Sequence, residues 1–194
     1  MRRYSKLLAS LALAGGSASQ AWALPKPMTL NPVFDNAVPS DLKLAPGVSP
    51  CPVHIAALED VRRSPEMIGI YDRRPIYAPG DRAAWLKSIV KGLESRGIAL
   101  AFDGEGVAPS AATAKLELTT AWINNTSANV SASAVFRMQI TTAKGGTAGG
   151  YYRGSNSRMP YWSTGPSILQ RALDHAFAGV LDSMATDLLK TCQA

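Results

Sequence analysis

The sequence predicts an α+β fold: a two-layer sandwich with a curved, mainly antiparallel sheet and two helices packed on one face. Apolar and polar side chains alternate through most of residues 115–140, the period of strands with one buried face. Apolar residues instead recur at helical spacing in 85–93 and 168–189. The order strand, helix, strand meander, helix suits two layers that share one core.

Short apolar segments predict the first strands. Pro52–Val61 begins with alternating apolar residues and is expected to be a strand. Met67–Tyr71 and Pro75–Tyr77 follow, separated by Arg73 and Arg74. These two segments predict a small hairpin or an irregular arm.

The first helix is expected to follow Asp81, which has the side chain of an N-cap. Gly97 has the character of the residue just beyond a helix end. One face of this helix carries Trp85, Leu86, Ile89, Val90 and Leu93, and the other carries Lys87, Lys91, Glu94 and Arg96. A short strand over Ile98–Phe102 comes next.

A long antiparallel hairpin has the clearest strand pattern in the chain. Its first strand is expected to place Leu116, Leu118, Thr120 and Trp122 on one face and Lys115, Glu117, Thr119 and Ala121 on the other. A turn at 124–127 follows. The second strand alternates from Val130 to Ile140, and a third strand is expected over Thr147–Arg153.

The last helix is expected to begin near Thr164, as N-cap, with Pro166 in its first turn. Its apolar stripe runs to about Lys190, some 25 residues. The stripe comprises Ile168, Leu169, Ala172, Leu173, Ala176, Phe177, Val180, Leu181, Met184, Leu188 and Leu189.

The first 23 residues have the pattern of a cleaved secretory signal peptide. Basic residues precede a short apolar run, and Ala21-Trp22-Ala23 is a small-residue site with cleavage between Ala23 and Leu24. Residues 24–50 hold six prolines and predict an extended linker or a strap on the domain. Residues 51–194 are expected to form a single domain. We therefore expect a periplasmic or secreted bacterial protein with no transmembrane segment.

Cleavage lowers the basicity of the working protein. The chain has 20 basic and 14 acidic residues, a net charge of +6, and the signal carries three of the basic ones. The mature chain is left with a net charge of +3, which is weak support for nucleic acid binding. Nucleic acid is therefore not an expected partner.

Two cysteines become interpretable in an oxidising compartment. Cys51 precedes the first apolar segment, and Cys192 is two residues from the end of the sequence. A disulfide between them would fasten both ends of the domain. Two free thiols are the alternative.

No constellation of residues in the sequence names a reaction. His54 and His175 are the only histidines, neither near a nucleophile motif, and both are expected to be structural. No metal site and no cofactor are expected. Asp103 and Glu105 lie two apart in a glycine-rich loop, and they support the alternative of a small secreted hydrolase.

Two sets of residues are candidates for binding by contact. Arg62, Arg63, Arg73 and Arg74 could engage phosphate or carboxylate groups, although they could equally form ion pairs at the sheet edge. Aromatic and arginine anchors follow in the Gly/Ser-rich stretch before the last helix: Tyr152, Arg153, Tyr161 and Trp162. An inhibitor that presents loop 154–165 is a further alternative.

The whole pattern resembles the YajG-like family of small bacterial envelope lipoproteins. The resemblance covers about residues 52–190: a strand ending in Leu58–Arg62, the Ile68-Gly69 step, a helix ending at Arg96-Gly97-Ile98, the hairpin and the last helix. It implies a two-layer α+β domain that acts by binding, with no catalytic residues. Unlike that family, this sequence has no cysteine directly after the signal.

We therefore expect an exported, non-enzymatic envelope protein. Its partner would be an envelope protein, a glycan or a lipid headgroup, and its oligomeric state is left open.

Overall fold

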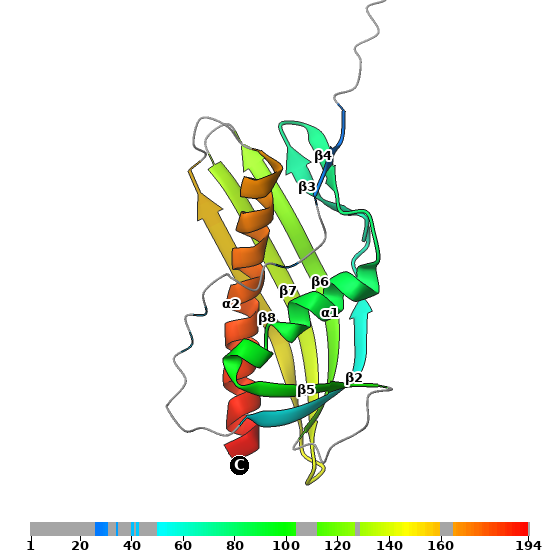
Figure 1. Cartoon of the computed structure of the whole chain (residues 1–194), viewed down its shortest axis with the longest axis vertical. Coiled ribbons are helices and arrows are strands. Elements are labelled where there is room, and N and C mark those ends of the chain that lie inside the picture. The colour runs from blue at the N-terminus through cyan, green and yellow to red at the C-terminus, as the bar shows by residue number, and fades with distance from the viewer. Residues whose placement is uncertain are drawn as a thin grey trace, which may run out of the picture.

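The computed structural model describes residues 26–30, 34, 40, 42, 50–103, 112–126, 129–159 and 165–193. Within these ranges an open, curved sheet of eight strands carries two helices, which lie in front of it in Figure 1. The predicted cleavage site between Ala23 and Leu24 lies outside the described residues, as do Glu105, Tyr161 and Trp162.

The strands confirm most of the expected segments. They are β1 (Met28–Thr29), β2 (Cys51–Asp60), β3 (Met67–Tyr71), β4 (Arg74–Tyr77), β5 (Ile98–Phe102), β6 (Ala112–Thr126), β7 (Asn129–Thr142) and β8 (Thr147–Arg158). Strand β6 is the centre of the sheet. It pairs with β7 along one edge, and along the other edge it pairs first with β2 and then with β3.

The sheet is mixed, so the expectation of a mainly antiparallel sheet is wrong for its first half. Strand β2 is parallel to both β5 and β6, β3 is parallel to β6, and β1 is parallel to β4. Only the pairs β3–β4, β6–β7 and β7–β8 are antiparallel. Between β2 and β5 the chain forms the β3–β4 hairpin and then a helix, and a connection of this length can return the chain in the same direction.

The first helix, α1 (Arg82–Lys91), starts as expected. The Asp81 carboxylate accepts hydrogen bonds from the backbone N–H groups of Ala83 and Ala84, at 2.9 and 3.1 Å. After α1 the chain tightens into a 3₁₀ turn over Glu94–Arg96. Gly97, with φ of 83°, therefore ends that turn and not the α-helix.

The second helix, α2 (Pro166–Gln193), is 28 residues long, three residues longer at its C-terminus than expected. Its apolar stripe packs on β6, β7 and β8, and Phe177 lies at the middle of the core. Its ring makes edge contacts with Phe34, Trp85 and Phe136, at centroid distances of 6.2, 5.7 and 6.3 Å. No helix in the described ranges has the length and hydropathy of a membrane-crossing segment.

One extra residue in β6 reverses the face of every side chain beyond it. Leu118 pairs with Phe136 and Thr120 pairs with Val135, so Thr119 is a β-bulge. Ala121 and Ile123 are consequently buried. The expectation that Trp122 shares a face with Leu116 and Leu118 is therefore wrong, because strict alternation does not survive a bulge.

Strands β6 and β8 both end later in the sequence than expected. Strand β6 continues through Thr126, where a turn was expected from residue 124. Strand β8 continues to Arg158, five residues past the expected end. Residues 154–158 of the loop proposed for an inhibitor are therefore part of a strand, held by pairing with Val130–Ala134 of β7.

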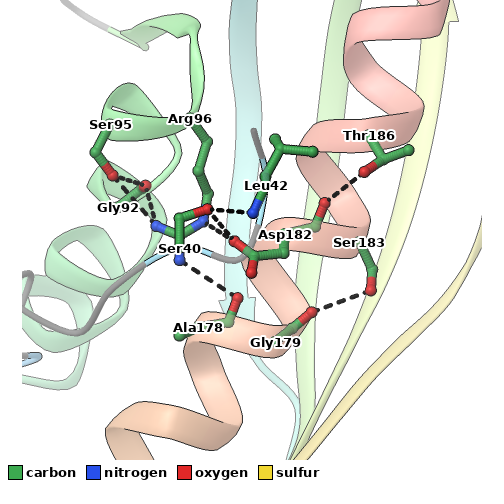
Figure 2. Close-up of polar contacts among 10 residues, drawn as sticks. All are labelled: Ser40, Leu42, Gly92, Ser95, Arg96, Ala178, Gly179, Asp182, Ser183 and Thr186. Atoms are coloured by element: carbon green, nitrogen blue, oxygen red, sulfur yellow. Dashed lines mark hydrogen bonds and ion pairs between the residues drawn. The ribbon is translucent and has the colours of Figure 1, made fainter. Parts of the chain in front are cut away.

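The described residues of the segment before β2, here called the strap (26–30, 34, 40, 42 and 50), contact the rest of the chain at separate points. Leu30 and Phe34 are buried, and Ser40 donates a hydrogen bond of 2.7 Å to Asp182 in α2. Figure 2 shows the same carboxylate accepting a bond of 2.6 Å from Arg96 Nε. Arg96 was expected on the solvent face of its helix but is buried, because this pair neutralises its charge.

The structure contains the Cys51–Cys192 disulfide. The two Cα atoms are 5.8 Å apart, within the range that a disulfide spans. It joins the start of β2 to the last turn of α2.

Candidate functional site

The face of the sheet opposite the helices, here called the outer face, carries the exposed side chains of β6, β7 and β8. Strand registers align these side chains in rows that cross the three strands. The rows are Glu117–Arg137–Tyr151, Thr120–Val135–Arg153, Trp122–Ser133–Ser155 and Asn124–Ser131–Ser157.

One end of the outer face is charged. Arg137 forms an ion pair with Glu117, and the hydrogen bond to Glu117 and its charge raise the pKa of Arg137 above its ordinary value. Tyr151, the third member of this row, is 61% exposed. Arg137 and Tyr151 line a depression of about 560 Å³ over the β7–β8 hairpin, where Gly149 supplies no side chain.

Trp122 lies between two smaller depressions, because its side chain lines both. One, of about 200 Å³, is lined mainly by small polar residues: Asn124, Ser131, Ala132, Ser133, Ser155, Asn156 and Ser157. The other, of about 240 Å³, is lined by Arg62, Arg63, Ser64, Met67, Thr119, Thr120 and Ala121. We call them the serine depression and the arginine notch.

The arginine notch arises where β6 changes partner. Strand β2 pairs with β6 as far as Leu118, and β3 takes over at Ile123. The bulge at Thr119 lies in the gap between them, and there Thr119 Oγ1 donates to the carbonyl of Val135 at 3.1 Å. The chain between β2 and β3 thus forms one wall of the notch and β6 the other.

Arg62 and Arg63 are neighbours with different environments. The Arg62 side chain is 5% exposed and forms two hydrogen bonds with the Asp60 carboxylate, at 2.8 and 2.7 Å. It also donates to the Pro65 carbonyl at 2.6 Å, and its guanidinium lies 5.2 Å from the Trp85 ring centroid. Arg62 therefore has a structural role, whereas Arg63 is exposed at the notch.

Arg73 and Arg74 lie at the tip of the β3–β4 hairpin, away from the notch. Tyr71 pairs with Arg74, so Asp72 and Arg73 form a two-residue turn with φ of 44° and 64°. Positive φ at both positions is the mark of a type I′ turn, which usually holds Asn and Gly. The Arg74 guanidinium lies 5.9 Å from the Tyr71 ring centroid.

Tyr152 and Arg153 point to opposite faces of β8. Tyr152 points toward α2 and donates a hydrogen bond of 3.0 Å to Asp187. Burial, with this hydrogen bond, raises the pKa of Tyr152 to about 12. Arg153 is exposed on the outer face, in the row next to Trp122.

Of the residues named for a hydrolase, the structure describes Asp103. Its side chain is 71% exposed, and its Oδ1 lies 2.8 Å from Nε2 of His54. A nucleophile would need to join such a pair to give a catalytic arrangement. In the part of the chain that the structure describes, no serine, threonine or cysteine side chain hydrogen bonds to His54. The described residues also contain no group of three His, Cys, Asp or Glu side chains placed to hold a metal ion.

Sequence reasoning placed Trp122 on the buried face, and it did not single out Ser133 and Ser155 as site residues. The signal for Trp122 is the shift of apolar phase from Leu116 and Leu118 to Ala121 and Ile123, with two threonines between. Such a shift marks a bulge. The serines carry no such signal, since small polar residues are typical of any wet face.

Comparisons with known proteins show the fold. No family model and no curated protein matches the sequence. The DUF330 protein XCC0632 from Xanthomonas campestris has a TM-score of 0.53 at 15% identity, covering 87% of this chain and 95% of that one. An uncharacterized protein has a TM-score of 0.52 at 8% identity, covering 84% and 99%.

A minor lipoprotein from Acinetobacter baumannii aligns more distantly. Its TM-score is 0.34 at 12% identity, covering 72% of this chain and 87% of that one, and this likeness carries no argument. The resemblance to the YajG-like family stays a prediction. What the first two structures do show is that this chain shares its fold with the DUF330 protein of Xanthomonas campestris.

Proposed function

We propose that this chain is an exported envelope protein that acts by binding a partner, and not by catalysis, through the outer face of β6, β7 and β8. The observation that supports this most is the aromatic and arginine content of a face that neither helix covers (Figure 1). Trp122 projects from β6, Arg137 from β7, and Tyr151 and Arg153 from β8. Such residues dominate the energetics of known interfaces.

Rigidity supports the same proposal. These side chains lie on long, paired strands, so they are held in place before a partner arrives and little ordering cost is paid on binding. Three depressions adjoin these side chains, so the face is not flat and a partner can fit into it. The signal-like first 23 residues support export, to the periplasm or beyond.

Site-specific photo-crosslinking in cells of the native host tests the proposal. A photoreactive residue at position 151 or 155 is expected to capture a partner, because both positions are on the outer face. The same residue at position 183, exposed on α2, is the matched control and is expected to capture none. Arg153→Glu should abolish the adducts at 151 and 155. Equal adducts at all three positions, or none, would contradict the proposal.

Export is tested in the same cells. We expect the protein in the osmotic-shock or secreted fraction with Leu24 as its N-terminal residue. Molecules in those fractions that retain Met1 would contradict the signal peptide assignment.

A further inference from the structure

Strand β8 forms one edge of the sheet over its whole length of 12 residues (Figure 1). It pairs with β7 from Thr147 to Arg158 without a bulge or shift in register, and among the described strands β7 is its one partner. The strands that end the other side of the sheet are much shorter, with two residues in β1 and five in β5. The free side of β8 is therefore the longest open edge in the described part of the chain.

The turn before β8 determines which backbone groups face this free edge. The Thr142 N–H donates to the Gly146 carbonyl at 2.8 Å, so the even-numbered residues of this hairpin hold the hydrogen-bonded positions. Bonded and non-bonded pairs alternate, and the register is regular, so the odd-numbered residues of β8 direct their N–H and C=O groups away from β7. These residues are Thr147, Gly149, Tyr151, Arg153, Ser155 and Ser157. They also belong to the outer face, so the edge and that face meet along one line.

Strand β8 lacks the usual protection of an edge strand. Such strands commonly carry proline, lysine or a bulge, each of which discourages another strand from pairing. The sequence of β8 contains neither proline nor lysine, and its pairing with β7 has no bulge. Glycines at positions 149, 150 and 154 add no side-chain bulk. The edge is therefore suited to accept another extended backbone.

A second copy of the chain does not suit this edge. Helix α2 lies directly over β8, since a Cβ at Gly154 would be 1.9 Å from the Ala176 carbonyl oxygen. Two β8 strands paired with each other would lie about 4.8 Å apart, whereas the axes of packed helices need about 8–10 Å. The two α2 helices would therefore compete for the same space. An extended segment with no helix over it avoids this conflict and makes the same main-chain hydrogen bonds.

Arg153 indicates the charge of such a segment. Its side chain is exposed on the outer face, near the middle of the edge. On an added strand, the side chain opposite Arg153 would lie on the same face within contact distance. Opposite charges at directly paired positions stabilise the pairing of two strands, and like charges destabilise it. An Asp or Glu opposite Arg153 is therefore favoured.

We propose that the free edge of β8 binds an extended segment of a partner protein, which joins the sheet as an additional strand and places an acidic residue opposite Arg153. This inference rests on the proposed function and names the kind of partner. Main-chain hydrogen bonds to the odd-numbered residues of β8 provide the affinity, and the side chains of the outer face select the sequence.

A proline variant tests the backbone contact. Ser155→Pro removes an N–H that faces the free edge and leaves the bonds to β7 intact, and Gly154 before it has no Cβ to clash with the ring. In cells of the native host, this variant should reduce the adducts of a photoreactive residue at position 151 at least about fivefold. Ser155→Ala, which loses the hydroxyl and keeps the N–H, is the matched control and should leave these adducts unchanged. Both purified variants should melt within about 5 °C of the parent protein.

The spacing of the crosslinks tests the extended conformation without any proline. Mass spectrometry of the adducts from positions 151 and 155 should identify one segment of one partner, with the two crosslinked residues about four apart and an Asp or Glu between them. Four residues of a strand span about 13 Å, so an extended segment stays in step with β8. A helix advances about 6 Å over four residues and would not stay in step.

The outcomes separate this inference from the proposed function. Edge pairing is overturned if Ser155→Pro leaves the adducts unchanged, if Ser155→Ala removes them equally, or if the two crosslinked residues lie in different segments. Adducts with peptides of this same chain, with a lipid or with a glycan would also overturn it, whereas the outer face would still bind a partner. A segment with no acidic residue between the crosslinks would overturn the role of Arg153. Absence of adducts at 151 and 155 in the parent protein instead contradicts the proposed function itself.

Discussion

At the scale of single residues, Asp182 joins three parts of the chain. Its carboxylate accepts from Arg96 after α1 and from Ser40 in the strap, and it is itself part of α2 (Figure 2). Arg96 also donates to the Gly92 carbonyl at 2.7 Å. The guanidinium is 3% exposed, so its charge depends on this one carboxylate.

Removing that carboxylate should therefore be costly. Asp182→Ala is expected to lower the free energy of unfolding by about 3–5 kcal/mol, because it leaves a buried charge without a partner. Urea denaturation measures the change. Lys190→Ala, which removes an exposed ion pair with Asp187, is the control and should cost less than about 0.5 kcal/mol. Similar small effects of both variants would show that Arg96 finds another partner.

Tyr152 gives a pH-dependent prediction. Its pKa in the folded protein is about 12, above the ordinary 10, so the folded state favours the neutral phenol. This contribution to stability is complete below pH 10 and is lost as the pH rises through 12. Tyr152→Phe should abolish the late step in a tyrosinate absorbance titration and flatten the alkaline loss of stability. An unchanged titration would contradict the hydrogen bond to Asp187.

The residue that anchors the candidate site was the one that sequence alternation assigned to the wrong face. Strict alternation from Leu118 places Trp122 on the buried face. The bulge at Thr119 shifts the alternation by one residue, so Trp122 lies on the outer face instead. Arg96 shows a related limit. Its burial depends on Asp182, 86 positions away, which no local pattern reveals.

At the scale of elements, α2 and β8 approach so closely that only glycine fits between them. A Cβ at Gly154 would lie 1.9 Å from the Ala176 carbonyl oxygen and 2.9 Å from the Val180 nitrogen, both backbone atoms of α2. Gly179 faces the same point from the helix, where its Cβ would be 3.6 Å from the Gly154 Cα. That distance is an ordinary van der Waals contact, so Gly154 is the glycine that the close approach requires.

Gly154→Ala should force the helix away from the sheet. We expect a loss of at least about 1–3 kcal/mol in the free energy of unfolding, the range of overpacked cores, with reduced solubility. Gly150→Ala is a matched control on the same strand and face, because a Cβ there meets nothing within 4 Å. The control should be neutral or slightly stabilising, since alanine is less flexible than glycine. A larger loss at position 150 than at 154 would contradict the close approach.

Local patterns predicted the elements better than their connections. The β6–β7 hairpin and both helices follow from periodicity, because their buried faces are long and regular. The end of β8 did not, since Gly154 to Arg158 has no apolar alternation and its glycine, serine and asparagine content is typical of a loop. The parallel pairing of β2 with β5 and β6 also did not, because it depends on which edge the chain reaches after α1.

At the scale of the whole molecule, the Cys51–Cys192 disulfide closes a loop with a sequence separation of 141 residues. The Cys51 side chain is buried beneath α2, beside Leu188. The bridge therefore ties the first residue of β2 to the helix that covers it.

Loss of the bridge should destabilise the domain without changing its fold. Replacing Cys51 and Cys192 together by alanine is expected to lower the free energy of unfolding by about 2–5 kcal/mol, because the unfolded chain gains freedom. Thermal unfolding with and without reductant measures this in the parent protein. Alkylation of the non-reduced protein under denaturing conditions should label neither cysteine. Labelling of both would instead indicate two free thiols.

The position of the bridge also has a mechanical consequence. A pull on Pro50, directly before β2, would act on the first residue of that strand and peel it from β5 and β6. The Cys51–Cys192 disulfide gives this force a second, covalent path. Tension applied through the strap and the last turn of α2 passes from Cys51 to Cys192 through a covalent bond. The hydrogen bonds that pair β2 with β5 and β6 are spared this tension.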